Sequence, residues 1–380
     1  MLDETVVMMP PSQCRVVLHY WGRRGGGSLL TSLLAQYLTD SHASAEVFLS
    51  LTQQNNDLKT FQASGLPLLT INRPNLRSLW RKGWFFPGQL AKHANALASL
   101  KPDAVIMTMN SLFAWPFIRA LQKRGLTVIY VAHDAEPHPG DYAATWQRVT
   151  QDLLIKSADW VVTLSSSVSR RLAERIPASV HKTSMIPLEA VYPTKRTHLP
   201  NRQSADEPIR LLFYGRLLSY KGLDCLAEVL QPLRADPRWR LTIAGSGPLA
   251  PEVRRTFAQW SQVDLELEWI SDERTAELFS RHHLLLCPYK EASQSGVIAE
   301  ALSWAMPSLV MPAGALPEQI GYGAAGLIAR TADAEGFRRS LQFVLDQPDV
   351  LAALSRGAAA LLAERRSKGE WLKLVEAIKS

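Results

Sequence analysis

The sequence predicts an α/β protein of two domains, each built on a parallel sheet. The chain has 380 residues, which is more than one hydrophobic core usually serves. Short apolar runs that suit buried strands alternate with longer helical patterns, as in a parallel sheet with crossover helices. The alternation stops in a polar, proline-containing stretch at 192–208 and then begins again, so we place the boundary there. The predicted parts are a first domain over 1–195, a linker over 196–208, a second domain over 209–364, and a C-terminal helix over 365–380 that could pack back on the first domain.

The bulk composition indicates a globular protein, which we expect in the cytoplasm. Hydrophobic residues make up 47% of the chain and charged residues 20%, and no apolar run reaches the roughly eighteen residues of a membrane-spanning helix. Residues 1–14 lack the basic start and apolar core of a signal peptide. The three scattered cysteines have no metal-ligand spacing, so we expect core or inert thiols, not disulfides or a zinc site.

The net charge of +7 is spread unevenly along the chain. Residues 1–200 hold 21 Lys and Arg against 13 Asp and Glu, whereas residues 201–380 hold 21 against 22. We therefore expect the first half of the chain to bind the acidic partner of the protein. Nucleic acid, an anionic membrane and a phosphorylated acceptor are the candidates.

A glycine-rich loop follows the first predicted strand. Residues 16–20 have the pattern of a buried strand, glycines occupy 25–27, and a helical pattern begins at Leu29. Such a loop lets the backbone approach a phosphate or a sugar. A dinucleotide site would need an acidic residue at the end of the second strand, whereas Glu46 stands at its start. We favour a substrate-facing loop, with a plain tight turn and a nicotinamide or flavin site as alternatives.

Residues 71–93 combine cations with aromatic rings. The segment holds five Lys and Arg, two Trp, two Phe and no acidic residue. This composition suits a bilayer interface. A surface helix whose aromatics cover the core and a platform for single-stranded nucleic acid are the alternatives.

Another polar candidate follows a later strand of the first domain. Further strands are predicted at 46–50, 104–108, 126–132 and 158–164, with a helix over 113–123. His133 and Asp134 follow the strand that ends at 132, and the carboxyl ends of parallel strands line the ligand crevice. His133 could therefore bond a sugar hydroxyl or a phosphate oxygen, the alternative being a local loop contact. Glu136, His138 and Asp141 have no metal-ligand spacing, so we predict no metal site.

The second domain begins with a strand that leads into a loop with two cations. The strand is predicted at 209–214, and Arg216 and Lys221 stand in the loop behind it. Both can converge on one anion, and on a diphosphate they would stabilise the charge that develops on a nucleotide leaving group. Two solvated surface charges are the alternative. Further strands are predicted at 240–244, before a tight turn at Gly245, and at 265–270.

The stretch 288–307 is where we expect the chemistry. An apolar run at 283–287 ends at Pro288, and a polar loop then leads into a helical pattern that Pro307 stops. Ser293, Gln294, Ser295 and Gly296 stand where this helix begins, so free backbone N–H groups and the positive end of the helix dipole would face an anion. A diphosphate would fit. Glu300, about one turn further along, could reach sugar or ribose hydroxyls.

These motifs together resemble the retaining glycosyltransferases of family 4, whose GT-B fold consists of two Rossmann-like domains that face each other across a cleft. The segments that carry the resemblance are, in order, Gly215-Arg216 with Lys221-Gly222, then 243–248, 288–307, and Gly314 with Pro317-Glu318. In the first domain it depends more loosely on the glycine-rich loop, His133-Asp134 and Ile186-Pro187.

The resemblance implies a role for each candidate residue. Arg216 and Lys221 would hold the donor diphosphate, Glu300 the ribose, and backbone amides at the start of the helix the phosphates. His133 would contact the donor sugar, over which the glycine-rich loop would close. The implied catalytic residues are Arg216, Lys221 and His133, and the implied residues for binding the nucleotide sugar are Gly26, Gly27, Gly215, Gly245, Glu291, Ser295, Gly296, Val297 and Glu300.

The chain departs from the family pattern at two positions. The family usually has two glutamates separated by seven residues, whereas Glu291 and Glu300 are separated by eight. Alignment backwards from Glu300 puts Ala292 at the first glutamate's place, so the role of Glu291 stays open. Leu188 stands where the family often has His after the Ile-Pro pair.

We therefore predict a retaining glycosyltransferase that moves a sugar from a nucleotide diphosphate sugar to a saccharide or lipid-linked saccharide, in cell-surface polysaccharide synthesis. The departing diphosphate would itself take the acceptor's proton, because no carboxylate pair of the glycosidase type is identifiable. Since these segments contain no Asp-x-Asp motif, we expect no metal requirement, and no cofactor besides the donor substrate.

Two rival functions remain: a non-catalytic partner with the same fold, and a nucleotide-sugar epimerase. We expect no nucleic-acid partner, because nucleic acid would not explain Arg216, Lys221 and Glu300. Peripheral contact with the inner face of an anionic membrane through 71–93 is the further expectation for partners and localisation.

Overall fold

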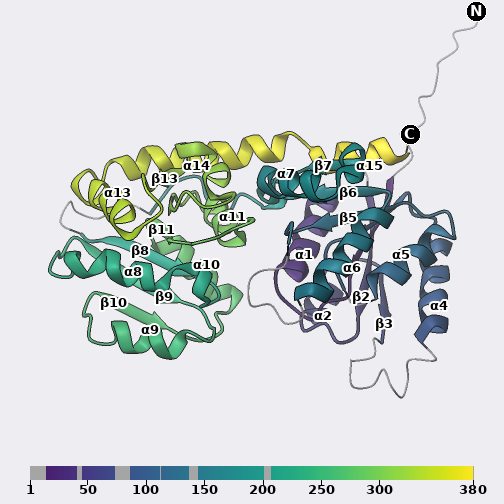
Figure 1. The fold of residues 1–380 in the computed structure, drawn as a ribbon, viewed down its shortest axis with the longest axis horizontal. Coiled ribbons are helices and arrows are strands. Elements are labelled where there is room, and N and C mark those ends of the chain that lie inside the picture. Colours follow the sequence, from purple (N-terminus) through teal and green to yellow (C-terminus); the bar gives the residue numbers. More distant parts are fainter. Residues whose placement is uncertain are drawn as a thin grey trace, which may run out of the picture.

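The computed structural model of this chain describes residues 14–40, 45–72, 86–111, 113–136, 144–200 and 207–379. They form two α/β units that lie side by side (Figure 1). Each unit contains one sheet whose strands are all parallel. The predicted fold class, two Rossmann-like α/β domains, is confirmed.

The first sheet has the strand order β3-β2-β1-β4-β5-β6-β7. Its strands are β1 (Cys14–Tyr20), β2 (Ala45–Thr52), β3 (Leu68–Ile71), β4 (Ala104–Met107), β5 (Val128–Ala132), β6 (Trp160–Thr163) and β7 (Thr183–Met185). The second sheet has the order β10-β9-β8-β11-β12-β13. Its strands are β8 (Ile209–Tyr214), β9 (Trp239–Ala244), β10 (Val263–Glu266), β11 (Leu284–Cys287), β12 (Ser308–Val310) and β13 (Gly326–Ile328).

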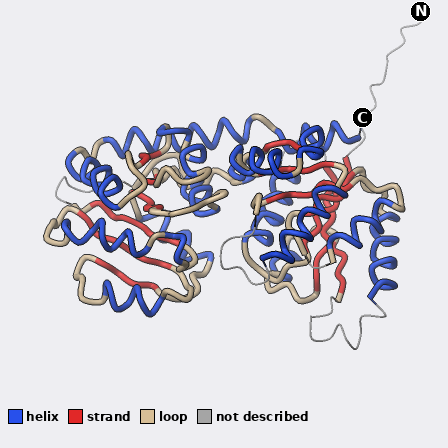
Figure 2. The backbone as a smooth tube through the Cα atoms, viewed as in Figure 1, coloured by secondary structure: helices blue, strands red, loops and turns tan. Residues whose placement is uncertain are grey.

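Helices cover both faces of each sheet (Figure 2). The first unit contains α1 (Gly26–Asp40), α2 (Leu58–Ala63), α4 (Phe86–Ser99), α5 (Ala114–Gln122), α6 (Ala144–Ser157), α7 (Ser166–Arg175) and the 3-10 helices η2 (Pro177–Lys182) and η3 (Leu188–Val191). The second contains η4 (Ser219–Lys221), α8 (Leu223–Leu230), η5 (Gln231–Leu233), α9 (Ala250–Phe257), α10 (Asp272–Arg281), α11 (Gly296–Ser303), α12 (Leu316–Gln319), η6 (Gly321–Gly323) and α13 (Ala334–Asp346).

Strand β1 shows why the sheets are covered on both sides. Val16, Leu18 and Tyr20 belong to one buried apolar cluster, and Val17 and Trp21 belong to the cluster on the opposite face. A strand buried on both faces reads as a continuous apolar run, without the alternation of a half-exposed strand. The apolar runs of the sequence therefore predicted the central strands well.

One predicted strand ends earlier than expected. The apolar pattern at 265–270 gives only β10, Val263–Glu266. The ladder ends where the Gly245 N–H donates to the Glu266 carbonyl at 2.9 Å. Trp269, predicted to lie in the strand, stands in the following loop and is 70% exposed.

The end of the chain connects the two units. Helix α14 (Val350–Ser367) begins on the second unit, and α15 (Glu370–Lys379) lies against the first, so that together they run along one side of the molecule (Figure 1). The Cys14 thiol of β1 donates to the Val375 carbonyl of α15 at 3.9 Å. The Arg366 guanidinium donates to the Tyr192 carbonyl at 2.7 Å. The C-terminal helices thus contact both units.

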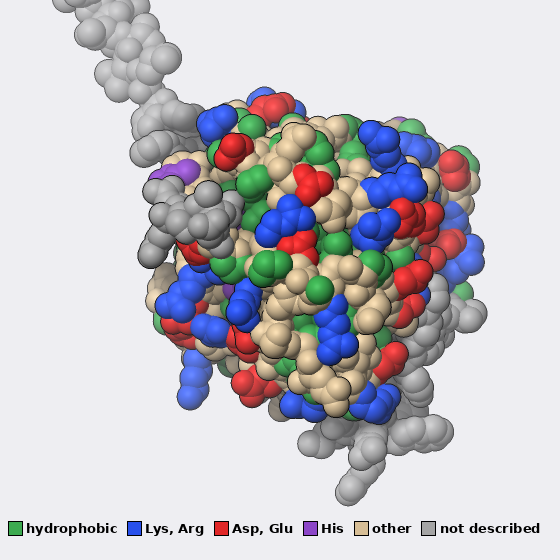
Figure 3. Space-filling view, turned by 90° about the vertical axis from the view of Figure 1, so that its left-hand side faces the viewer, with side chains coloured by type: hydrophobic (Ala, Val, Ile, Leu, Met, Phe, Trp, Pro, Cys, Tyr) green, Lys and Arg blue, Asp and Glu red, His purple; other side chains and the backbone are tan. Residues whose placement is uncertain are grey.

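One face of the second unit carries charges of both signs. On the end face of the second unit, Lys and Arg side chains are interspersed with Asp and Glu (Figure 3). Within the described ranges, no helix has the length and apolar character needed to span a membrane.

Part of the aromatic and cationic segment 71–93 lies outside the described residues, namely 73–85. Its C-terminal part forms the start of α4, where Phe86 and His93 are buried. The predicted membrane contact therefore stays a prediction. Residues 137–143, which include His138 and Asp141, also lie outside the described ranges.

Candidate functional site

The loop that follows β8 brings a buried cation to the carboxyl edge of the second sheet. Gly215 begins the loop with a φ of +114°, and η4 ends at Lys221. Gly222 has a φ of +71°, and a Cβ atom there would overlap the Pro288 carbonyl oxygen. The Lys221 side chain lies under this packing, with Nζ 3.7 Å from the ring centroid of Tyr289. The loop that follows β11, which contains Pro288 and Tyr289, thus fixes the orientation of the Lys221 side chain.

Burial lowers the pKa of the Lys221 ammonium to about 8, and the Arg216 charge nearby also lowers it. Arg216 itself is exposed. Among the residues that the structure describes, no carboxylate forms an ion pair with either side chain. Two neighbouring cations without a carboxylate partner favour an anionic ligand.

Helix α11 begins beside this loop. Ser295 is its N-cap, and its Oγ atom accepts from the Ile298 N–H at 3.4 Å. A Cβ atom at Gly215 would lie 3.3 Å from a methyl group of Val297, so the two loops are in contact. The positive end of the α11 dipole therefore lies at the loop that carries Arg216 and Lys221.

One predicted phosphate-binding amide is already occupied. The Ser295 N–H donates to Oε1 of Gln319 at 2.7 Å. In the described part of the chain, the N–H groups of Gly296 and Val297 have no protein acceptor, and Gly296 is exposed. The amides at this helix start that remain free for an anion are therefore those of Gly296 and Val297.

A second tight turn closes the same edge of the sheet. Gly245, after β9, has a φ of +143°, and a Cβ atom there would overlap the carbonyl oxygen of Gly215. Only glycine allows this approach. Gly215 and Gly245 therefore let the ends of β8 and β9 approach each other at the start of the loop that carries Arg216.

Glu300 lies one turn into α11 and is held by two donors. Its Oε1 atom accepts from Nζ of Lys195 at 2.5 Å and from Nε1 of Trp304 at 2.9 Å. Its side chain is 14% exposed. The carboxylate is thus fixed but still accessible.

His133 contacts the second unit. Its Nε2 atom lies 2.7 Å from the Thr108 carbonyl oxygen, to which it donates, and its Nδ1 atom accepts from Nε2 of Gln294 at 3.1 Å. Burial lowers the pKa of His133, so the ring is neutral in this arrangement. Oε1 of Gln294 is buried, and no hydrogen-bond partner for it exists among the described residues. The sequence pattern placed Gln294 at the helix start but did not indicate its contact with His133.

Glu291 does not take part in these contacts. Its side chain is exposed, and no partner for it exists among the described residues. Ala292, at the place of the family's first glutamate, is buried, and its carbonyl accepts from the Ala315 N–H at 3.0 Å. In the predicted alignment, a small apolar side chain therefore stands where the family usually has a carboxylate.

The glycine-rich segment of the first unit differs from a free loop. Gly26 and Gly27 form the first turn of α1. Gly27 packs closely on Tyr20 and Met109, whereas the space next to Gly26 is open. The Arg24 guanidinium carbon before them lies 5.6 Å from the ring centroid of Trp269 in the second unit. Closure of this segment over a sugar stays a prediction.

Further contacts between the units were not foreseen. The Ser165 hydroxyl donates to the Ser293 carbonyl at 2.8 Å. The Glu318 carboxylate accepts from the Ser166 N–H at 3.1 Å, where α7 begins. A carboxylate at a helix start is favoured by the dipole. Glu318 belongs to a motif of the second domain, but nothing in the sequence indicated its partner.

A buried ion pair lies behind this contact. Glu189 and Arg365 approach within 3.1 Å with side chains 1% and 9% exposed. Arg365 also donates to the Gln319 carbonyl at 2.9 Å, and Nε2 of Gln319 donates to the Glu189 carboxylate at 2.5 Å. Burial raises the pKa of Glu189, and Arg365 lowers it. This network joins η3, α12 and α14.

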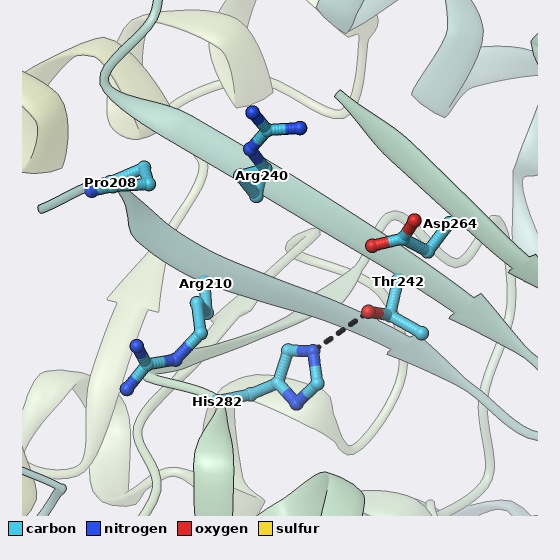
Figure 4. A pocket seen from close by; sticks show the side chains of 6 residues that line it. All are labelled: Pro208, Arg210, Arg240, Thr242, Asp264 and His282. Carbon is cyan, nitrogen blue, oxygen red and sulfur yellow. Dashed lines mark hydrogen bonds between the residues drawn. The ribbon is translucent and has the colours of Figure 1, made fainter. Parts of the chain in front are cut away.

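A small pocket elsewhere does not belong to the site. It has a volume of about 210 Å³ and is lined by Pro208, Arg210, Arg240, Thr242, Asp264 and His282 (Figure 4). Except for Thr242, in the middle of β9, these residues stand at or near the amino-terminal ends of the strands, whereas ligands of open α/β sheets bind at the carboxyl ends. Nε2 of His282 contacts the Thr242 hydroxyl at 2.9 Å. Among the described residues, no group of His, Cys, Asp and Glu is arranged to hold a metal ion.

Relatives of known sequence match parts of the chain. A relative from Xanthomonas campestris is named GDP-mannose:glycolipid 4-beta-D-mannosyltransferase. It is 32% identical over 170 residues, which are 43% of this chain and 46% of the relative. A D-inositol 3-phosphate glycosyltransferase from Geodermatophilus obscurus is 24% identical over 236 residues, 58% of this chain and 52% of the relative. The chain thus matches about half the length of each.

Solved structures share the whole fold. A glycosyltransferase from Rickettsia africae is 15% identical, with a TM-score of 0.73 over 97% of this chain and 99% of that one. HepE from Anabaena, in complex with UDP, is also 15% identical, with a TM-score of 0.72 over 97% of both chains. At this identity the likeness shows the fold alone.

Two family models cover most of the chain. The model described as Glycosyltransferase Family 4 matches residues 24–188. The model described as Glycosyl transferases group 1 matches residues 208–347. The chain therefore belongs to the family 4-type glycosyltransferases with the GT-B fold.

Proposed function

We propose that the protein transfers a sugar from a nucleotide diphosphate sugar to a saccharide or lipid-linked saccharide. The observation that carries the proposal is the grouping of Arg216, Lys221 and the free amides of Gly296 and Val297 at one sheet edge. Two cations and a helix start are suited to a pyrophosphate, whose charge grows as the sugar leaves. The name of the Xanthomonas relative, with a GDP-sugar donor and a glycolipid acceptor, supports the substrate class.

We propose retention at the anomeric carbon without a metal ion. Glu300 is bonded to Lys195 and Trp304, Glu291 is exposed, and Ala292 replaces the family's first glutamate. In this scheme no carboxylate serves as nucleophile. The leaving diphosphate, held by Arg216 and Lys221, takes the proton of the acceptor hydroxyl while that hydroxyl bonds to the anomeric carbon on the same face. Catalysis then consists of positioning and charge stabilisation.

The sugar would lie beside the contact between His133 and Gln294. Oε1 of Gln294 is buried and has no partner in the part of the chain that the structure describes, so it can accept from a sugar hydroxyl. We place the protein in cell-surface polysaccharide synthesis, in the cytoplasm and peripherally at the membrane. The basic first half and a relative named for a glycolipid acceptor support this assignment.

The proposal is tested by screening UDP-, GDP- and ADP-sugars for thermal stabilisation, because a ligand of the folded state raises its stability by mass action. The donor that stabilises the protein is then incubated with saccharide and lipid-linked acceptors, with and without a chelator. NMR of donor and product reports the anomeric configuration of each. We expect chelator-resistant transfer with retention.

Contrary outcomes identify the rivals. Binding of a nucleotide sugar without transfer to any acceptor would point to the non-catalytic partner. Isomerisation of the donor sugar would point to the epimerase. A product whose anomeric configuration is opposite to that of the donor would refute retention but not transfer.

A further inference from the structure

The carboxylate of Glu300 is held at one of its two oxygens. Lys195 Nζ lies 2.5 Å from Oε1, and Trp304 Nε1 lies 2.9 Å from the same atom. Among the described residues no donor bonds Oε2. Because both protein donors converge on Oε1, the carboxylate is fixed in orientation while Oε2 remains available to a ligand.

Lys195 does not belong to α11 but to the segment that connects the two units. The N–H groups of Lys195 and Arg196 donate to the Ser303 carbonyl at 2.8 and 3.0 Å. At the other end of α11, the Tyr192 hydroxyl donates to the Gly296 carbonyl at 3.4 Å. The connecting segment therefore runs along the whole of α11, and this docking places the Lys195 side chain beside Glu300.

The Lys195 side chain is also supported laterally. Its Nζ atom lies 5.6 Å from the ring centroid of Trp304, within the range of a cation–π contact. The side chains of Lys195 and Glu300 are 35% and 14% exposed, so the pair is partly shielded from water. The Lys195 ammonium, the Trp304 indole N–H and the Glu300 carboxylate thus form one cluster of contacts.

We propose that Lys195 is a positioning residue, which orients Glu300 so that Oε2 accepts hydrogen bonds from the ribose of the nucleotide. The inference depends on the proposed function, because it needs a nucleotide at α11. Lys195 also offsets the charge of Glu300, which would otherwise repel the anionic diphosphate near Lys221. The ribose site then combines Glu300 of α11 with Lys195 of the connecting segment.

The test compares two ligands that differ only in the ribose. The dissociation constants of UDP, GDP and ADP are measured by calorimetry, and the diphosphate that binds most tightly is compared with its 2′,3′-dideoxy form. A hydrogen bond to a charged group predicts that the dideoxy form binds the wild type about tenfold more weakly or worse. In Lys195→Met we expect this ratio to fall close to one, and in Lys195→Arg we expect most of it to return.

Two further variants sharpen the comparison. Trp304→Phe removes the indole N–H but keeps a ring, so it should lower the ratio partly. Lys368→Met removes an exposed lysine that pairs with Glu364 at 3.0 Å on α14, and it should leave the ratio unchanged.

The outcomes separate this inference from the proposed function. If the wild type binds none of the three diphosphates, the proposed function itself fails. If the wild type distinguishes ribose from dideoxyribose and Lys195→Met does so equally well, the positioning role is refuted while the proposed function stands. Equal weakening of both ligands in Lys195→Met, with their ratio unchanged, would leave Lys195 only a charge or structural effect and would also refute the positioning role.

Discussion

Nε2 of Gln294, in the second unit, lies 3.1 Å from Nδ1 of His133, in the first. Since the Nε2 atom of His133 donates to the Thr108 carbonyl, its Nδ1 atom must be the acceptor. Gln294 can therefore only donate through its NH₂ group, and Oε1 is left for another donor. The sugar site proposed here uses that oxygen.

Replacement of Gln294 should affect the sugar but not the nucleotide. In Gln294→Ala we expect kcat/KM for transfer to fall about tenfold, since a buried hydrogen bond to the sugar is lost. The dissociation constant of the nucleoside diphosphate, which carries no sugar, should stay the same. Steady-state kinetics and calorimetry measure the two quantities. An equal loss in both would mean that Gln294 supports the loop and does not contact the sugar.

The affinity for a nucleoside diphosphate should fall at alkaline pH. Lys221 has a pKa of about 8, lowered by burial, and only its protonated form attracts the diphosphate. Affinity should therefore be highest below pH 8 and weaken as the pH rises through it, by about tenfold per pH unit at most. Calorimetry from pH 7 to pH 9.5 measures the change, with Lys290→Met, which breaks an exposed ion pair with Asp224, as control. A constant affinity over this range in the wild type would contradict a role for the Lys221 charge.

The buried pair of Glu189 and Arg365 should be important for stability. Arg365→Met leaves the Glu189 carboxylate buried without its cation, which should lower the free energy of unfolding by about 3–5 kcal/mol. Chemical denaturation measures this. Arg339→Met breaks an exposed pair with Glu335 and should cost less than about 1 kcal/mol. Similar small effects in both variants would show that the network contributes little.

Mild acid should destabilise the first unit through two buried histidines. The Ser50 hydroxyl lies 3.0 Å from Nδ1 of His19 and 2.8 Å from Nε2 of His93. Burial lowers the pKa of His19 well below its usual value, and that of His93 to about 4. Below about pH 6.5 the unfolded chain binds protons that the folded chain does not, so the free energy of unfolding falls as the pH decreases toward 4.

The slope should approach about 1.4 kcal/mol per pH unit for each such histidine. Urea unfolding at pH 7, 6 and 5 measures it. His93→Phe should reduce this slope by the contribution of one histidine. This holds whatever the stability of the variant at pH 7. An unchanged slope in this variant would mean that His93 takes up its proton in the folded state as readily as in the unfolded chain.

The fold was predictable because its central strands are buried on both faces and read as apolar runs. The short strands β3, β7 and β13 were not predicted. Residues of β3 and β7 are largely half-exposed, and β13 has only three residues, of which two are half-buried. A pattern of three or four such residues carries no clear period.

The sequence predicted site residues that stand close together along the chain. It did not predict contacts between residues that are far apart in the sequence. Arg216 and Lys221 stand five residues apart in one loop, so one segment indicated both. Glu189 and Arg365 have no such link along the chain. A carboxylate within the otherwise apolar run 188–191 was the available sign of a buried pair, but it could not name the partner.

The central claim is that Arg216, Lys221 and the start of α11 hold a pyrophosphate. It is tested most directly by calorimetric titration of the wild type, Arg216→Ala and Lys221→Ala with UDP, GDP and ADP, alongside thermal unfolding without ligand. We predict that the wild type binds at least one diphosphate, that each variant unfolds cooperatively, and that Lys221→Ala binds at least about tenfold more weakly and has a turnover lower by orders of magnitude. Near-normal binding and transfer by Lys221→Ala would contradict the account.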